Sequence, residues 1–120
     1  MVSFAVMTFM YQGQINGGDI TDEQLIDLVA ESGATGIEAF HQIFLDDADL
    51  VKRYLRAMPA AGVSMPVIDV IVNLCYRTQA ERSERVDQLR RGLDVCAELS
   101  AEIAHVAGSR LPEGMAPAEG

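Results

Sequence analysis

The sequence has little cysteine, little positive charge and no tryptophan. Its two cysteines, Cys75 and Cys96, stand far apart without a Cys-x-x-Cys spacing, which excludes a disulfide framework and a cysteine-based zinc site. We expect both to be buried, reduced thiols. Nine Lys and Arg against 18 Asp and Glu give a net charge of -9. This balance argues against a general nucleic-acid binder and against docking on an anionic membrane.

The sequence also lacks a targeting or membrane-spanning segment. No basic residue precedes the first apolar run, as a signal peptide would require. The longest apolar stretch, Val67 to Tyr76, is interrupted by Asp69 and Asn73 and is too short to cross a bilayer. We therefore expect a cytoplasmic protein.

What is present is a repeating alternation of strand and helix patterns. With 49% hydrophobic residues spread over 120 positions, the chain can form one domain with its own core. Segments rich in apolar and β-branched residues predict four strands, near 3–9, 35–40, 67–73 and 102–107. Three helices are predicted between them. The first has a capping box at Thr21 and Gln24, and the third has Val86, Leu89, Leu93, Cys96 and Ala97 on its buried face.

Four strands alternating with three helices imply parallel strands joined by right-handed crossovers. Either an open doubly wound sheet or a closed (β/α)8 barrel is built from this unit. The loop after the first strand contains glycines at positions 13, 17 and 18 but no G-x-G-x-x-G and no G-K-[ST] motif. The absence of a phosphate-binding pattern favours the barrel.

Three short motifs in this order resemble the xylose-isomerase-like barrel superfamily, and within it the sugar phosphate isomerase/epimerase group. They are GIEAF (36–40), AAGV (60–63) and IAHVAGSRLPEG (103–114). The resemblance implies that residues 1–120 form the N-terminal half of a TIM-type (β/α)8 barrel, with strands one to four. Relatives often carry Arg where this chain has His105, and Gly where it has Ser100.

The resemblance further implies that the full-length protein isomerises, epimerises or dehydrates a sugar or polyol with a divalent metal (Mn, Mg, Zn or Co). In the family, the metal ligands and the acid/base carboxylates lie on the later strands. We therefore assign no catalytic residue, metal ligand or cofactor to this chain, and expect that no metal-binding cluster of Glu, Asp and His can be assembled from it. Whether the chain itself is an enzyme stays open.

Three polar residues are candidates for binding substrate at the C-terminal ends of the strands: Glu38, Asn73 and His105. A carboxylate within an apolar strand needs a partner, so Glu38 either binds a sugar hydroxyl or pairs with a neighbouring strand. The Asn73 amide suits a hydroxylated ligand but also a turn. His105 is expected to face the barrel interior, where it orients a substrate oxygen, supports a metal site by bonding to one of its ligands, or makes a structural hydrogen bond.

Other polar residues receive structural interpretations. Asp69 lies mid-strand and is predicted to make a structural hydrogen bond, although a barrel-interior carboxylate is the alternative. His41 is assigned to a loop, and the acidic run at 46–49 to a helix cap.

Two other functions remain open. An abasic-site endonuclease would share the barrel, but its several histidines and basic surface are missing here. The other alternative is a non-catalytic half barrel, either a truncated gene product or one that self-associates through its open sheet edges.

Overall fold

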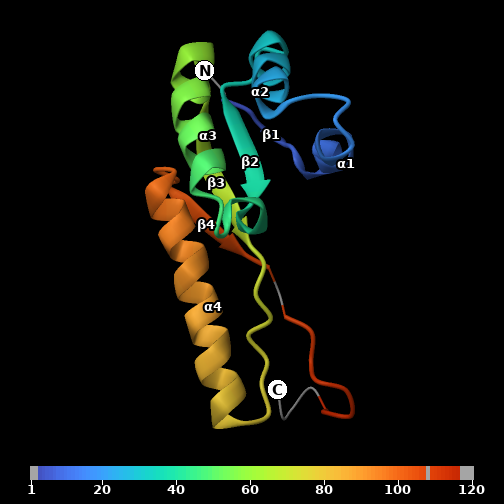
Figure 1. The fold of residues 1–120 in the computed structure, drawn as a ribbon. Helices are drawn as coiled ribbons and strands as arrows, with labels where there is room; N and C mark the ends of the chain where they lie inside the picture. Colours follow the sequence, from blue (N-terminus) through green and yellow to red (C-terminus); the bar gives the residue numbers. More distant parts are fainter. Residues whose placement is uncertain (1–2, 108, 117–120) are drawn as a thin grey trace.

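A computed structural model describes residues 3–107 and 109–116; Gly108, part of the third motif, lies outside them. Four parallel strands form one sheet in chain order, β1-β2-β3-β4 (Figure 1). This confirms the predicted order and excludes the reversal of a doubly wound sheet. The strands are β1 (Ala5–Met7), β2 (Gly36–Phe40), β3 (Ser64–Val70) and β4 (Ile103–Val106).

Helices connect successive strands, and local sequence signals fix their ends. The long helices are α2 (Asp22–Glu31), α3 (Ala48–Ala61) and α4 (Gln79–Glu98); the short ones are η1 (Phe9–Tyr11), α1 (Gln12–Asn16) and η2 (His41–Phe44). The predicted capping box is present, since Thr21 accepts from the Gln24 amide while the Gln24 side chain accepts from the Thr21 amide. Asp47 and Thr78 cap α3 and α4 through one hydrogen bond each, accepted by the side chain from the backbone amide three residues on. No helix in the described ranges is long and apolar enough to cross a bilayer.

The long helices cover one face of the sheet (Figure 1). Every second strand residue points into the core beneath them, including Ile37, Ile68 and Val70, all essentially inaccessible to water. Tyr54 of α3 lies in the same core, where its hydroxyl donates to the buried Asp22 of α2. The opposite face of the sheet, which we call the inner face, carries the alternate residues of each strand.

The third strand and the third long helix differ from prediction. β3 begins three residues earlier than expected and ends at Val70, so Asn73 lies in the loop that follows it. Pro66, which discourages a strand assignment, sits inside β3. Its ring packs beside Gly36 of β2, where an added Cβ would lie 3.1 Å from the ring carbons. In α4 the buried residues are Gly92, Val95 and Cys96, whereas the predicted Leu93 is exposed.

Smaller expectations also meet corrections. The first strand is only three residues long, and the glycine-rich segment after it forms η1 and α1 instead of an open loop. Pro59, a residue that can end a helix early or kink its last turn, lies inside α3, which continues to Ala61. Cys96 is buried as expected, but Cys75 is only partly so.

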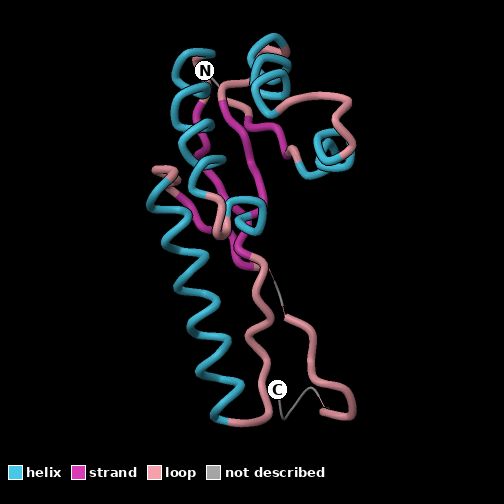
Figure 2. Tube along the Cα trace, in the orientation of Figure 1, coloured by secondary structure: helices cyan, strands magenta, loops and turns pink. Residues whose placement is uncertain are grey.

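The first half of α4 extends past the sheet, together with the loop at 71–78 and the segment at 109–116 (Figure 2). Loop and segment are joined by two hydrogen bonds, from the Asn73 amide to the Arg110 carbonyl and from the Leu74 amide to the Ser109 hydroxyl. The molecule is therefore elongated, with principal extents of 47 × 32 × 27 Å.

Gly92 is the point at which α4 touches the sheet most closely. A Cβ built there would lie 2.4 Å from Cγ1 of Val70, a strand residue whose branched side chain has little freedom to move. We expect Gly92→Ala to lower the free energy of unfolding by about 1–3 kcal/mol, because overpacking outweighs the better helix propensity of alanine. Denaturant unfolding monitored by circular dichroism measures this change.

Gly13 provides the matched control. It is also helical, but a Cβ there meets nothing within 4 Å. Gly13→Ala should leave stability unchanged or raise it slightly through helix propensity alone. Equal effects of the two substitutions would contradict close packing at Gly92.

His41 connects the ends of β2 and β3. It is buried, and its Nδ1 accepts a hydrogen bond of 3.1 Å from the Ile71 amide, which requires an unprotonated Nδ1. Burial lowers the pKa of His41 below its usual 6.5, and the charge of Arg91 lowers it further, against the opposing effect of the Asp69 carbonyl. His41 thus makes structural contacts between the ends of two neighbouring strands.

This burial makes stability depend on pH. The unfolded chain takes up a proton at His41 near pH 6.5, before the folded chain does. The stability from neutral His41 is therefore complete above pH 6.5 and lost as the pH falls below it. We expect His41→Gln, which can still accept from Ile71, to show a shallower loss between pH 6.5 and 5 in urea unfolding. Identical pH profiles for the two proteins would refute the assignment.

Candidate functional site

Three strands each place one ionisable side chain at the same point of the inner face. Glu38 comes from β2, Asp69 from β3 and His105 from β4. Their ligand atoms, two carboxylate oxygens and one imidazole nitrogen, all lie within 4.8 Å of one another. We call this group the inner-face cluster.

The strand register explains why these residues meet. Asp69 pairs directly with His105 across β3 and β4, so both side chains leave the sheet on the same side. Glu38 pairs with Val67, two residues before Asp69, which puts Glu38 on that side as well. The residues between them, such as Ile68, point to the helices. A shift of one residue in any strand would remove its member from the cluster.

Asp69 is the centre of the cluster and is only 3% exposed. Its Oδ1 lies 2.5 Å from Nδ1 of His105, and because a carboxylate only accepts, the imidazole donates this bond. The other oxygen, Oδ2, is buried without a hydrogen-bond partner. A buried carboxylate oxygen without a partner is costly, so Asp69 retains the capacity to bind a donor or a cation.

Glu38 and His105 are more accessible than Asp69. Glu38 is half-buried, and the His105 side chain is 59% exposed. Burial raises the pKa of the Glu38 carboxyl, and the neighbouring Asp69 raises it further by repulsion and hydrogen bonding, while His105 acts in the opposite direction. Two carboxylates with one imidazole can hold a proton, a hydroxyl group or a cation between them.

The structure brings two of the three predicted substrate-binding residues together and leaves the third apart. Glu38 and His105 belong to the inner-face cluster, whereas Asn73 is in the loop after β3, where its side chain bonds the Arg110 carbonyl and the Cys75 amide. The contacts of Asn73 are therefore those of a turn-forming residue. Its displacement follows from the early end of β3.

The expectation that no cluster of Glu, Asp and His could be assembled from this chain is wrong in its geometry. Asp69 does make the structural hydrogen bond predicted for it, with His105 as its partner, and it is also the interior carboxylate of the alternative. Strand alternation places Asp69 on one face, but only the register of three strands shows that Glu38 and His105 share it.

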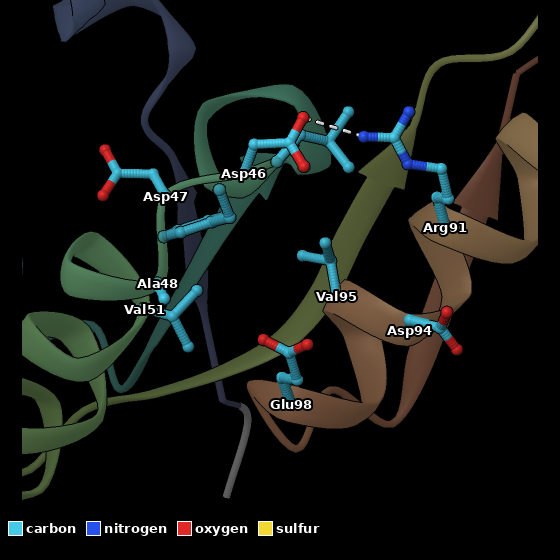
Figure 3. Close-up of a pocket in the computed structure, with 10 residues that line it drawn as sticks. Asp46, Asp47, Ala48, Val51, Arg91, Asp94, Val95 and Glu98 are labelled. Atoms are coloured by element: carbon cyan, nitrogen blue, oxygen red, sulfur yellow. Dashed lines mark hydrogen bonds and ion pairs between the residues drawn. The ribbon is translucent and has the colours of Figure 1, made fainter.

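A cavity of about 430 Å³ lies elsewhere, between the start of α3 and the second half of α4 (Figure 3). Four carboxylates line it, and the only cation among its lining residues, Arg91, is already paired with Asp46 at 2.8 Å. Asp47 caps α3, as the acidic run predicted. This pocket is on the helical side of the sheet and has no contact with the inner-face cluster.

No family model matches the chain, and no curated protein is similar enough in sequence to count as a relative. Two solved structures are similar in fold. The probable 3-DHS dehydratase AsbF, involved in petrobactin synthesis in Bacillus anthracis, aligns with 88% of this chain and 38% of its own, at 12% identity and a TM-score of 0.69. The protein SMc04130 from Sinorhizobium meliloti 1021 aligns with 96% of this chain and 39% of its own, at 18% identity and a TM-score of 0.76.

At these identities the similarity concerns the fold alone, and the chain spans less than two-fifths of either neighbour. The four parallel strands in chain order are those of half a (β/α)8 barrel, and both neighbours share this arrangement over the aligned part. The fold class predicted from the sequence is thereby confirmed: the chain has the architecture of half of a (β/α)8 barrel.

Proposed function

We propose that this chain supplies the N-terminal half of a barrel protein that isomerises, epimerises or dehydrates a sugar or polyol. In this proposal, the inner-face cluster binds the substrate. The observation that carries it is the convergence of Glu38, Asp69 and His105 on the face that lines the interior of a barrel. The (β/α)8 fold of the two structural neighbours supports it.

The cluster suits a molecule rich in hydroxyl groups. The unpartnered Oδ2 of Asp69 can accept from one hydroxyl, and the half-buried Glu38 carboxyl can hydrogen-bond to a second. His105, exposed and oriented by Asp69, reaches outward from the sheet. Such groups hold a substrate in register while a proton is removed next to its carbonyl.

Isomerisation and epimerisation of this type pass through an enediolate, which a divalent metal stabilises when bound. The resemblance places the family's metal ligands and its acid/base carboxylates on later strands. The proposed role of this half is therefore substrate binding and positioning. A dehydratase would use the same first step, since loss of water follows removal of the same proton.

The test is an activity assay of the longest form that the gene encodes, with ketoses and cyclic polyol ketones in the presence of Mn²⁺ or Mg²⁺. We expect Glu38→Gln and Asp69→Asn to lower kcat/KM at least about tenfold, because each removes a polar contact to the substrate. Asp94→Asn, in the outer pocket, should leave it unchanged. Turnover that is unaffected by both cluster variants would contradict the proposal, as would the absence of turnover of every substrate.

The 120-residue chain alone should behave differently. Within the described residues, β1 and β4 each pair with one strand only, and Ile103 of β4 is 56% exposed on the inner face. An open edge beside apolar surface favours association, so we expect dimers or larger species at micromolar concentration and no isomerase activity with added metal. Sedimentation velocity measures the association.

Ile103→Lys places a charge on that edge and should shift the distribution towards monomer. A control, Leu28→Lys, changes an equally exposed apolar residue on the helical face and should not. A monomeric wild-type chain that converts a keto-sugar would refute this expectation.

A further inference from the structure

We propose that Glu38, Asp69 and His105 together bind one divalent transition-metal cation, so that this half of the barrel holds a metal site of its own. The site would draw its ligands from β2, β3 and β4. It differs from the site implied by the family resemblance, whose ligands lie on later strands. It also does not depend on the proposed reaction, because the cation would bind without substrate.

The donor set selects the class of metal. Two carboxylate oxygens and one imidazole nitrogen suit Zn²⁺, Co²⁺ and Mn²⁺, whereas Mg²⁺ prefers oxygen ligands alone. Three protein ligands leave at least one coordination position for water. That number is typical of catalytic sites and not of closed structural ones.

The geometry is close to that of a bound ion. With metal–ligand distances of about 2.1 Å, the ligand atoms of a tetrahedral site lie about 3.4 Å apart. The three residues offer ligand atoms within 4.8 Å of one another, and the 2.5 Å hydrogen bond between Asp69 and His105 would open to admit the ion. Glu38 is half-buried and has three rotatable bonds, so its carboxylate can close the remaining gap without movement of the backbone.

An independent observation is the state of Asp69. Its Oδ2 is buried and has no hydrogen-bond partner, although the whole residue is only 3% exposed. In the described part of the chain, no Lys or Arg forms an ion pair with Asp69 or Glu38. With no Lys or Arg beside them, the two neighbouring carboxylates can be compensated only by His105, by a shared proton or by a bound cation.

A divalent cation compensates this arrangement better than protons do. A proton satisfies one oxygen, and a protonated His105 adds one positive charge at the exposed side of the cluster. A cation with two charges neutralises both carboxylates and gives Asp69 Oδ2 a ligand bond. Its other contacts are the imidazole and water from the open side of the site.

The test is a titration of the metal-free 120-residue chain with cobalt chloride, followed by visible absorption, with zinc chloride as competitor. We expect one Co²⁺ per chain, with the intense visible bands of four- or five-coordinate cobalt, displaced by Zn²⁺. Glu38→Gln and Asp69→Asn should each weaken binding at least about tenfold. His105→Asn should change the band positions as well as the affinity, because it removes the only nitrogen ligand.

Asp94→Asn and Glu98→Gln are matched controls, because they remove one carboxylate each from the outer pocket and leave the inner-face cluster intact. They should retain wild-type affinity, which separates a specific site from general attraction to a chain of net charge -9. Circular dichroism of each metal-free variant shows whether it still folds. Glu38→Gln is the most informative variant, because Glu38 is only half-buried and its substitution should remove a ligand without disturbing the fold.

The proposal is overturned if cobalt binds without those bands, if binding is equally strong in Glu38→Gln and Asp69→Asn, or if no binding occurs up to millimolar metal. In the last case, the two carboxylates share a proton instead. Each of these results is separate from the activity assay above. If this chain binds cobalt but the longer protein turns over no substrate, the metal site stands and the proposed reaction is refuted.

Discussion

The arrangement of this molecule depends on the hydrogen-bonded register of its parallel strands. Because side chains alternate along a strand, one register decides at once which residues enter the core and which line the inner face. In β3 it sends Ile68 and Val70 beneath the helices and Asp69 to the opposite side. The apolar contacts of the core therefore hold the polar cluster in place, even though no member of the cluster belongs to that core.

Close packing imposes a second constraint on the same elements. Gly36 leaves room for the ring of Pro66 on the neighbouring strand, and Gly92 lets α4 approach Val70. In each case a side chain larger than hydrogen would push an element away from β3. These two glycines allow neighbouring elements to pack closely. Gly33 and Gly62 instead adopt the left-handed conformation at the turns from helix to strand. At the third such turn Ser100 adopts a positive φ of 57°, a conformation that glycine would adopt with less strain.

The sequence was sufficient to predict the fold class, the strand order and the capping box, because these depend on local pattern and on the chirality of crossovers. It was not sufficient to end β3 correctly. Proline is unusual inside a strand, so Pro66 obscures the start of β3. The run of residues favouring a strand continues through Val72 and Asn73, although both already lie in the loop after Val70. For the same reason Asn73 was predicted at a site that it does not join. The grouping of Glu38, Asp69 and His105 rests on pairings between residues more than 25 positions apart, which no local pattern records.

The length of α4 relative to its strands has a consequence for how stability is distributed. Twenty residues of helix extend about 30 Å, whereas the four residues of β4 extend about 13 Å. All three fully buried residues of α4 fall in its second half, so only that half is held by the core. The first half, polar and supported by few contacts, forms a unit that opens locally at low free-energy cost while the sheet stays intact. Amide hydrogens of this helix should therefore exchange with solvent at two distinct rates, divided near Gly92.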